Sequence, residues 1–543
     1  MKKVRLLSLL SVSALVATVL VTAPTVANAA PACDGKSPIQ TCVGVTSDGA
    51  PYAMQVPANF NGTVALYSHG YRYNVDIPAA IPLIGGYKIT NTPEPVPGGN
   101  AAVAQYFFSQ GIAIVGSGFA RQGWNPDSAI KTNVELIDTF KKQFPKTTNV
   151  VAWGSSLGGV ITQGLAEKHP ELVSAVAPMC MADNISPQLT MAGDFLWGIK
   201  VLFDPSIKGG NYSPGAAGVA ESYADLGKVF TVMGKLQAAL ATGAWPDTSS
   251  ATGKSLAAAG VPSRSALLLL GLMAGLPTQS AHFDSISGPD GALKLTFPLA
   301  LSPALAILEN GTNAAALAVL ATQDVENQVG GAIFDNTKTD YAARVDGERV
   351  IYNAALSGNT VIDALLGALS TANPGAPRAK ADPAAVAKMN ALHTNTGKIN
   401  VPTILMVGVA DPITPAGASQ RLVDLYAEQY AAEKAAAQKA YQATRTYKTP
   451  TNKLLMLWNT TPSSYTKFDA AGSPITSVPA AQGTNHCNFT SAQLVLVAKS
   501  LVQASSTGKL PSGGALNTAV RKAGNLSVDK GIRLPWLKSY GDN

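Results

Sequence analysis

Short apolar runs alternate with amphipathic stretches along residues 63–179 of the chain. Each apolar run is typical of a buried strand, and the apolar side chains between the runs recur at helical spacing. The predicted strands are residues 63–68, 112–117, 150–153 and 173–179, and the predicted helices are residues 100–109 and 127–144. Strands and helices in alternation predict an α/β fold with a doubly wound, mostly parallel sheet.

The pattern changes in the middle of the chain and later returns. Residues 182–398 hold Ala- and Leu-rich helical segments and loops, without a convincing core strand. This stretch is too long for a structureless loop, so we expect an inserted helical subdomain, here called the cap. Strand-like runs return at 401–409 and 453–458, and helices are predicted at 416–447 and 491–504.

Period-two alternation over residues 39–57, around the turn at 47–50, predicts an antiparallel hairpin at the edge of the sheet. Two separated segments are therefore expected to form one domain. The predicted division is a signal peptide (1–29), a first segment of the sheet domain (30–181), the cap (182–398), a second segment of the sheet domain (399–508) and a Gly/Ser/Pro-rich C-terminal tail (509–543).

The N-terminal residues have the features of a targeting segment. Lys2, Lys3 and Arg5 precede an apolar run over 6–21, and residues 27–29 (Ala-Asn-Ala) match a small-x-small cleavage site. This pattern predicts a cleaved Sec-type signal peptide and a secreted protein. No later stretch was found with the roughly 18–20 apolar residues that cross a bilayer, so stable membrane insertion is not expected.

The formal charge is +7 for the full chain, and removal of Lys2, Lys3 and Arg5 with the signal peptide leaves +7 − 3 = +4. This charge is modest, and the lysines and arginines are scattered. The absence of a basic tract with interleaved aromatic residues argues against nucleic-acid binding. Nothing in the sequence indicates an oligomeric state.

The chain has four cysteines, at positions 33, 42, 180 and 487. Export favours disulfides, and four cysteines allow more than one set of pairings. Pairing Cys33 with Cys42 closes a short loop and leaves Cys180 with Cys487; two unrelated buried thiols are the alternative for the second pair. The chain has no Cys-x-x-Cys motif and no His/Cys cluster, so neither a metal nor an organic cofactor is expected.

Residues 154–158 (Gly-Ser-Ser-Leu-Gly) lie between the predicted strand at 150–153 and a predicted helix. Strand, G-x-S-x-G turn and helix in this order form the context of a nucleophile elbow. A side chain at either flanking glycine would collide with the neighbouring backbone. The chain here resembles the α/β-hydrolase superfamily, in particular secreted bacterial serine esterases and lipases, and this resemblance implies that Ser156 is the nucleophile.

The superfamily order of nucleophile, acid and base guides the search for the other two residues. Of the five histidines, His486 follows the last predicted strand, where the superfamily places its base; a capping or surface role is the alternative. Asp411 follows the strand at 401–409 and is the expected acid, although it could instead cap the next helix. Asp183, after the strand at 173–179, is the rival acid.

The oxyanion of an acyl transfer needs two N–H donors. The resemblance assigns one to Leu157, after the nucleophile. It assigns the other to Tyr71, because His69-Gly70 resembles the oxyanion loop of lipases and esterases. An aromatic donor is similar to that of cutinase-like polyester hydrolases. The step from His486 to Cys487 resembles tannases and feruloyl esterases, but their cysteine before the nucleophile is replaced here by Ser155.

These residues predict a secreted serine hydrolase that cleaves small-molecule or polymeric carboxylic esters. The first alternative is a serine peptidase of the prolyl or tripeptidyl aminopeptidase type, which would need an acidic anchor in the cap. The second is a non-catalytic binding protein on the same fold. Apolar cap stretches such as residues 195–197 and 297–308 are expected to form the core of the cap, with some lining a pocket over Ser156.

Overall fold

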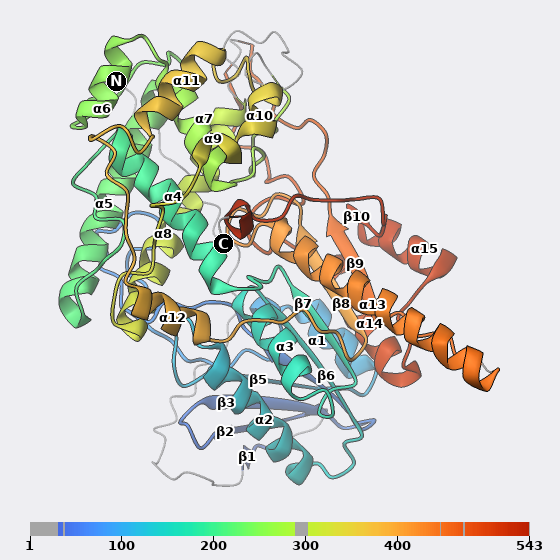
Figure 1. Cartoon of the computed structure of the whole chain (residues 1–543). Coiled ribbons are helices and arrows are strands. Elements are labelled where there is room, and N and C mark those ends of the chain that lie inside the picture. The colour runs from blue at the N-terminus through green and yellow to red at the C-terminus, as the bar shows by residue number, and fades with distance from the viewer. Residues whose placement is uncertain (1–30, 36–37, 288–301, 446, 471–472, 542–543) are drawn as a thin grey trace.

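The computed structural model describes residues 31–541, except 36–37, 288–301, 446 and 471–472. The predicted signal peptide therefore lies outside the described residues. A single sheet runs in the order β1-β2-β3-β5-β4-β6-β7-β8-β9-β10 (Figure 1). Its strands are β1 (Ala32–Cys33), β2 (Ile39–Val45), β3 (Pro51–Pro57), β4 (Thr63–Ser68), β5 (Ala113–Ser117), β6 (Asn149–Ser155), β7 (Ala175–Met179), β8 (Thr403–Gly408), β9 (Leu454–Asn459) and β10 (Leu526–Ser527).

Parallel pairing joins the strands from β5 through β4, β6, β7 and β8 to β9. The predicted hairpin is present as β2 and β3, which extend one edge in antiparallel register. The structure thus has the predicted α/β-hydrolase fold, a mostly parallel sheet with an antiparallel edge. The cap begins after β7 and the chain returns to the sheet at β8, so the insertion joins two neighbouring strands.

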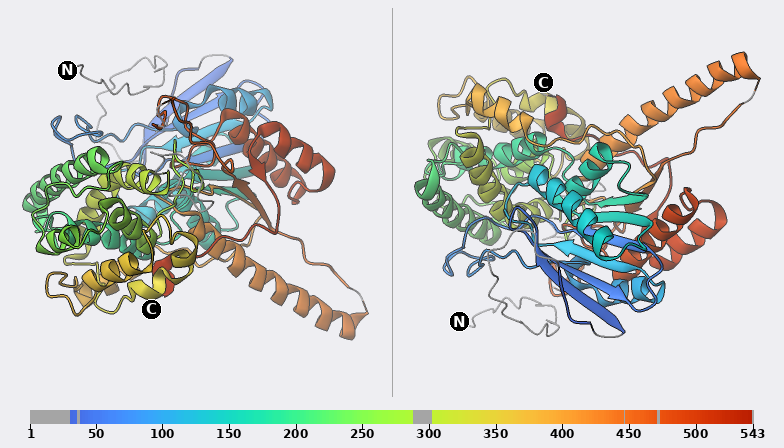
Figure 2. Two further views of the ribbon diagram at one scale, coloured as in Figure 1. Left: turned by 90° about the horizontal axis from the view of Figure 1, so that it is seen from above. Right: turned by 90° about the horizontal axis from the view of Figure 1, so that it is seen from below.

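Helices cover both faces of the sheet because successive strand residues point to opposite sides. In β4, Val64 and Leu66 pack in the cluster that contains α2 (Pro126–Gln143), α3 (Leu157–Lys168) and the start of α13 (Ala416–Thr444). Ala65 and Tyr67 pack in the cluster with α1 (Ala101–Ser109) and α14 (Ser491–Thr507). Beyond its buried start, α13 projects away from the body of the molecule (Figures 1 and 2).

The cap is a helical lobe with its own hydrophobic core, beside the carboxyl ends of the parallel strands (Figure 1). Its described residues contain no strand. Its helices are α4 (Ile185–Leu202), α5 (Gly215–Ala239), α6 (Ala251–Ala258), α7 (Ser263–Ala274), α8 (Ser302–Val329), α9 (Tyr341–Arg344), α10 (Asp346–Ile351), α11 (Asn359–Ala368) and α12 (Pro383–Ala391).

Helix α8 packs against α4, α5 and α7. Among the described residues, α8 is the one helix that is long and apolar enough to cross a membrane, judged by length and composition alone. The sequence pattern did not reveal an apolar helix of this length. Most of its length is buried, and it carries Asp324 and Glu326 in buried positions. This burial is typical of the central helix of a lobe.

Asp324 ties α8 to loops that follow two core strands. Its fully buried carboxylate accepts hydrogen bonds from Arg121 Nη2 at 2.5 Å, from the backbone N–H of Trp124 at 2.7 Å and from Asn74 Nδ2 at 2.8 Å. Asn74 follows β4, whereas Arg121 and Trp124 follow β5. One carboxylate therefore joins the cap to the loops that follow β4 and β5.

A second buried carboxylate, Asp284, joins another part of the cap to the loop after β9. It accepts from the backbone N–H groups of Tyr465 at 2.9 Å and Thr466 at 2.8 Å, and from Ser287. Burial raises the pKa of Asp284, but these hydrogen bonds outweigh it and lower the pKa to about 2. Nearby, His282 donates from Nδ1 to Glu309 at 2.7 Å.

Residues 509–543, expected as a tail, contain ordered structure in their described part. Helix α15 (Gly513–Ala523) buries Leu516 and Val520, which lie one turn apart. Strand β10 then pairs with β9, and a 3₁₀ helix, η2 (Lys538–Gly541), packs against α4. The prediction of a tail was based on the Gly/Ser/Pro-rich composition and did not take account of Leu516 and Val520.

Asp324→Ala is expected to lower the free energy of unfolding by about 1–3 kcal/mol, because the buried N–H of Trp124 loses its acceptor. Thermal unfolding and limited proteolysis of the cap measure the effect. Asp247→Ala, which removes an exposed cap carboxylate, is the matched control and should leave both unchanged. Equal stability of the two variants would contradict this account of the anchor.

Candidate active site

Ser156 lies in a strained turn between β6 and α3. Its φ of 59° and ψ of −124° are rare for a residue other than glycine. A Cβ at Gly158 would lie 1.9 Å from the Ser68 carbonyl oxygen, and a Cβ at Gly154 would lie 2.2 Å from that of Gly158. The predicted steric need for glycine is therefore present at both positions, and the turn has the geometry of a nucleophile elbow.

His486 lies directly beside Ser156, although the two are far apart in sequence. The hydroxyl Oγ of Ser156 lies 2.8 Å from His486 Nε2. The other ring nitrogen, Nδ1, lies 2.9 Å and 3.0 Å from the two carboxylate oxygens of Asp411. Because a carboxylate only accepts, Nδ1 carries the proton and Nε2 is free to accept one from Ser156.

Asp411 is fully buried in the turn after β8. Its carboxylate also accepts from the backbone N–H groups of Ile413 and Thr414 at 2.9 Å and of Cys487 at 3.1 Å. These donors stabilise the buried charge and orient the side chain toward His486. The capping alternative is not observed, because α13 begins after Pro415 without a side-chain cap.

Asp183, the rival acid, has different partners. Its buried carboxylate accepts from Arg421 Nη1 at 2.7 Å and from the hydroxyl of Tyr540 at 2.9 Å. Burial raises the pKa of Asp183, and the charge of Arg421 opposes that rise. Asp411, and not Asp183, is therefore the carboxylate that contacts His486.

The remaining histidines lie elsewhere. His69 is buried against the ring of Phe119, and burial lowers the pKa of its imidazole to about 4. His393 is buried beside Asn395, His282 pairs with Glu309 in the cap, and His169 follows α3. None of these four is hydrogen-bonded to Ser156.

The loop after β4 runs directly over the elbow. A Cβ at Gly70 would lie 3.3 Å from Cβ of Ser156, so Tyr71 follows at the edge of the site. Tyr71 and Leu157 line the same cavity as Ser156. Within the described residues, the backbone N–H groups of Tyr71 and Leu157 have no hydrogen-bond partner, which leaves both donors available.

Both disulfides expected from the sequence are present, between Cys33 and Cys42 and between Cys180 and Cys487. The second bond joins the end of β7 to the residue after His486. Asn485 and Cys487 on either side of His486 have positive φ angles of 60° and 52°. Asparagine tolerates this left-handed conformation, whereas cysteine rarely adopts it, and the covalent link holds the loop at Cys487.

Among the described residues, one group of side chains is close enough to hold a metal ion, formed by Asp411, His486 and Cys487. The sulfur of Cys487 is bonded to Cys180 and is no thiolate ligand. Two donors remain, fewer than the three or four protein ligands of typical zinc sites. The residues present therefore do not fit a zinc centre.

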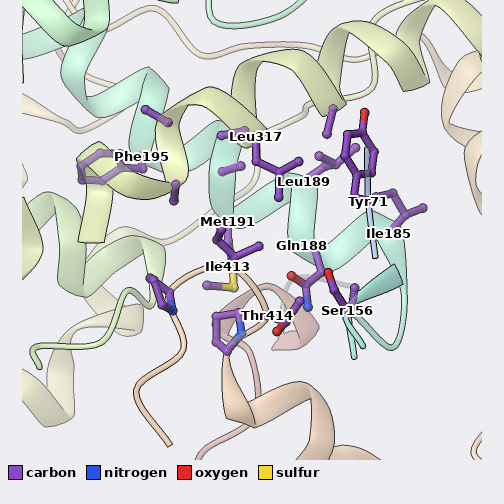
Figure 3. Close-up of a pocket in the computed structure, with 18 of the residues that line it drawn as sticks. Tyr71, Ser156, Ile185, Gln188, Leu189, Met191, Phe195, Leu317, Ile413 and Thr414 are labelled. Atoms are coloured by element: carbon purple, nitrogen blue, oxygen red, sulfur yellow. The ribbon is translucent and has the colours of Figure 1, made fainter. Parts of the chain in front are cut away.

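A cavity of about 110 Å³ extends from Ser156 between α4 and α8 (Figure 3). Its walls are mostly apolar. Gln188 and Thr414 lie with Ser156 at one end, and Phe195 lies at the other (Figure 3). The amide nitrogen of Gln188 is buried without a hydrogen-bond partner in the described part of the chain.

Sequence reasoning missed Gln188 and the contribution of Thr414. Thr414 Oγ1 lies 3.1 Å from Asp411 Oδ2 and 2.8 Å from the carbonyl oxygen of Cys180, so it connects the ends of β7 and β8. For Thr414, its place three residues after Asp411 was the available signal. Gln188 had no such signal in the sequence, because its position beside Ser156 depends on how α4 packs over the turn at Ser156.

Comparison with known proteins returns distant structural similarity. No protein-family model and no curated protein matches the chain. The chain is similar to feruloyl esterase B from Aspergillus oryzae (13% identity, 87% of this chain and 81% of that chain, TM-score 0.31). It is also similar to the rice cell wall degrading esterase LipA from Xanthomonas oryzae (12% identity, 87% of this chain and 93% of that chain, TM-score 0.31).

The Pyrococcus furiosus esterase Pf2001 matches at 12% identity and a TM-score of 0.21, over 28% of this chain and 55% of that chain. The chain thus covers about half the length of this esterase. Similarity this weak carries no argument about activity. The fold assignment rests on the sheet order and on the turn at Ser156.

Replacing Cys180 and Cys487 together by alanine is expected to lower the free energy of unfolding by about 2–4 kcal/mol, because the bond closes a very long loop. Chemical denaturation measures the loss. The matched control replaces Cys33 and Cys42, which are separated by only 9 positions against 307 for the other pair. A larger loss of unfolding free energy in the Cys33 and Cys42 variant would contradict the stabilising role assigned to the bond between Cys180 and Cys487.

Proposed function

We propose that this protein is a secreted serine hydrolase that cleaves carboxylic esters through a Ser-His-Asp triad and an acyl-enzyme. One observation carries the proposal: Ser156, His486 and Asp411 form a continuous hydrogen-bonded chain with separations of 2.8 Å and 2.9 Å. A serine hydroxyl is a weak nucleophile at neutral pH and needs an adjacent base held in the correct tautomer.

In the first half of the reaction, Ser156 Oγ attacks the ester carbonyl and its proton passes to His486 Nε2. The carboxylate of Asp411 stabilises the imidazolium that forms. His486 then gives the proton to the departing alcohol oxygen as the carbon–oxygen bond breaks. In the second half, His486 takes a proton from water as the water oxygen attacks the acyl carbon. His486 then returns the proton to Ser156 Oγ as the bond between Oγ and the acyl carbon breaks, which releases the acid and restores Ser156.

The tetrahedral intermediates carry a negative oxygen that needs preorganised donors. The unpartnered N–H groups of Leu157 and Tyr71 are the proposed pair. The buried phenol of Tyr71 stays protonated, because burial raises its pKa well above the usual value. Tyr71 therefore contributes its backbone donor and an uncharged aromatic ring to the site.

The cavity favours an ester over an aminopeptidase substrate. An enzyme that binds a free peptide amine needs a carboxylate near the scissile bond, whereas the described residues that line this cavity include no aspartate or glutamate. In this proposal, residues 30–181 and 399–508 form the catalytic domain and residues 182–398 form the cap. The two disulfides and the signal-like N-terminal sequence support export.

Ser156→Ala is expected to reduce hydrolysis of p-nitrophenyl acetate by on the order of 10⁴–10⁶-fold without lowering the melting temperature. Steady-state kinetics and thermal unfolding measure the two effects. Labelling of wild-type protein by a fluorophosphonate, absent from the variant, identifies Ser156 directly. Retained turnover in the variant, or selective cleavage of aminoacyl amides by wild type, would refute the proposed function.

Asp411→Asn is expected to lower kcat by on the order of 10⁴-fold, because the amide no longer stabilises the imidazolium or fixes its tautomer. Asp183→Asn is the comparison variant. It should lower the melting temperature, since Arg421 loses a buried partner, but should change kcat far less. A larger loss of kcat in Asp183→Asn would move the acid to that residue.

A further inference from the structure

The cavity at Ser156 is elongated along two helices. On α4 its lining extends from Ile185 to Leu196, and on α8 from Ala321 to Gly311. Figure 3 shows Ile185 near Ser156 and Phe195 at the other end. Ten residue steps along a helix rise about 15 Å, so the cavity forms a channel between α4 and α8. A channel of this shape suits a single unbranched chain better than a ring.

The two ends of the channel differ in polarity. Ser156, Gln188 and Thr414 lie together at one end (Figure 3). The walls beyond them are apolar, and those on α8 are mostly small residues on one face of the helix. These α8 residues are Gly311, Ala314, Ala315, Leu317, Ala318 and Ala321. The polarity of the channel therefore matches a molecule with one polar head and an aliphatic tail.

Phe195 closes the far end. A Cβ built at Gly311 would lie 2.6 Å from the Phe195 ring, so helix and ring are already in close contact there. Phe195 is only 5% exposed, and it packs within the core cluster of the cap. The position of this ring therefore sets the end of the space available to a chain that starts at Ser156.

The channel lies on the acyl side of the proposed reaction. Tyr71 and Leu157, the proposed oxyanion donors, line it, whereas His486 does not. Since His486 must protonate the departing alcohol oxygen, the alcohol has to leave on the side of His486. The group that enters the channel is therefore the acyl group.

We propose that the substrate is an ester of an unbranched aliphatic carboxylic acid, whose acyl chain lies between α4 and α8, and that Phe195 limits the chain length. This inference rests on the proposed ester hydrolysis. Extra methylene groups that fill apolar space strengthen binding of the transition state until the chain reaches the ring. Past that length, the added carbons meet a closed wall.

The test measures kcat/KM for p-nitrophenyl esters of unbranched acids from acetate to hexadecanoate, with pivalate and benzoate as bulky acyl groups. Wild type should prefer an unbranched chain of intermediate length over acetate, pivalate and benzoate. Ala318→Leu places a larger side chain in the channel and should lower the ratio for that preferred ester over acetate by about tenfold or more. Phe195→Ala should raise the ratio of longer esters over the preferred one by a similar factor.

Asn313→Leu adds the same side chain at an exposed position on α8 and should leave the chain-length profile unchanged. Turnover of p-nitrophenyl acetate and the melting temperature show whether each variant folds. The two channel variants are expected to shift the chain-length preference in opposite directions. If one of them does not fold, the other still tests the proposal. The acyl-channel proposal would be wrong if acetate turnover depends on Ser156 but neither channel variant changes the dependence of kcat/KM on chain length. A wild-type preference for pivalate or benzoate would also contradict it. No turnover of any ester would instead refute the proposed function.

Discussion

The turn at Ser156 imposes the steric constraint on which the rest of the site depends. Because a Cβ at Gly158 would meet the carbonyl oxygens of Ser68 at 1.9 Å and His69 at 2.7 Å, the start of α3 lies directly on the end of β4. The same contact fixes where the loop after β4 begins, and so where Gly70 and Tyr71 lie. The exposed hydroxyl and the proposed second oxyanion donor are therefore consequences of one close backbone approach.

The ends of the next strands are tied together by polar and covalent links. Thr414 contacts the carbonyl of Cys180, Cys180 is bonded to Cys487, and the N–H of Cys487 donates to Asp411. These links connect β7, β8 and the loop that carries His486. They lie at the carboxyl ends of β7 and β8, where the cap leaves the sheet after β7, and they hold the groups beside Ser156 together across the insertion.

The fold was predictable wherever the signal was local. Strand-like runs and the G-x-S-x-G turn are readable because they depend on neighbouring residues, and the mostly parallel sheet followed from the alternation of strands and helices. Helix α15 was missed because only Leu516 and Val520 mark it within a Gly- and Ser-rich segment. The positions of Ser156, His486 and Asp411 agree with the expected order, but the sequence left Asp183 open, since its pairing with Arg421 joins distant segments.

The channel was not predictable, because it exists only after the cap has docked. Its walls depend on Asp324, which holds α8 against the loop containing Arg121 and Trp124. No local sequence pattern predicts that contact. Asp284 holds the cap to the loop after β9 in the same manner. Swinging the cap away would exchange these hydrogen bonds for bonds to water, at a net cost of about 0.5–1.5 kcal/mol each. The contacts on both sides therefore favour a cap that acts as a fixed wall. In the proposed reaction, the shape of this wall and not its opening would select among acyl groups.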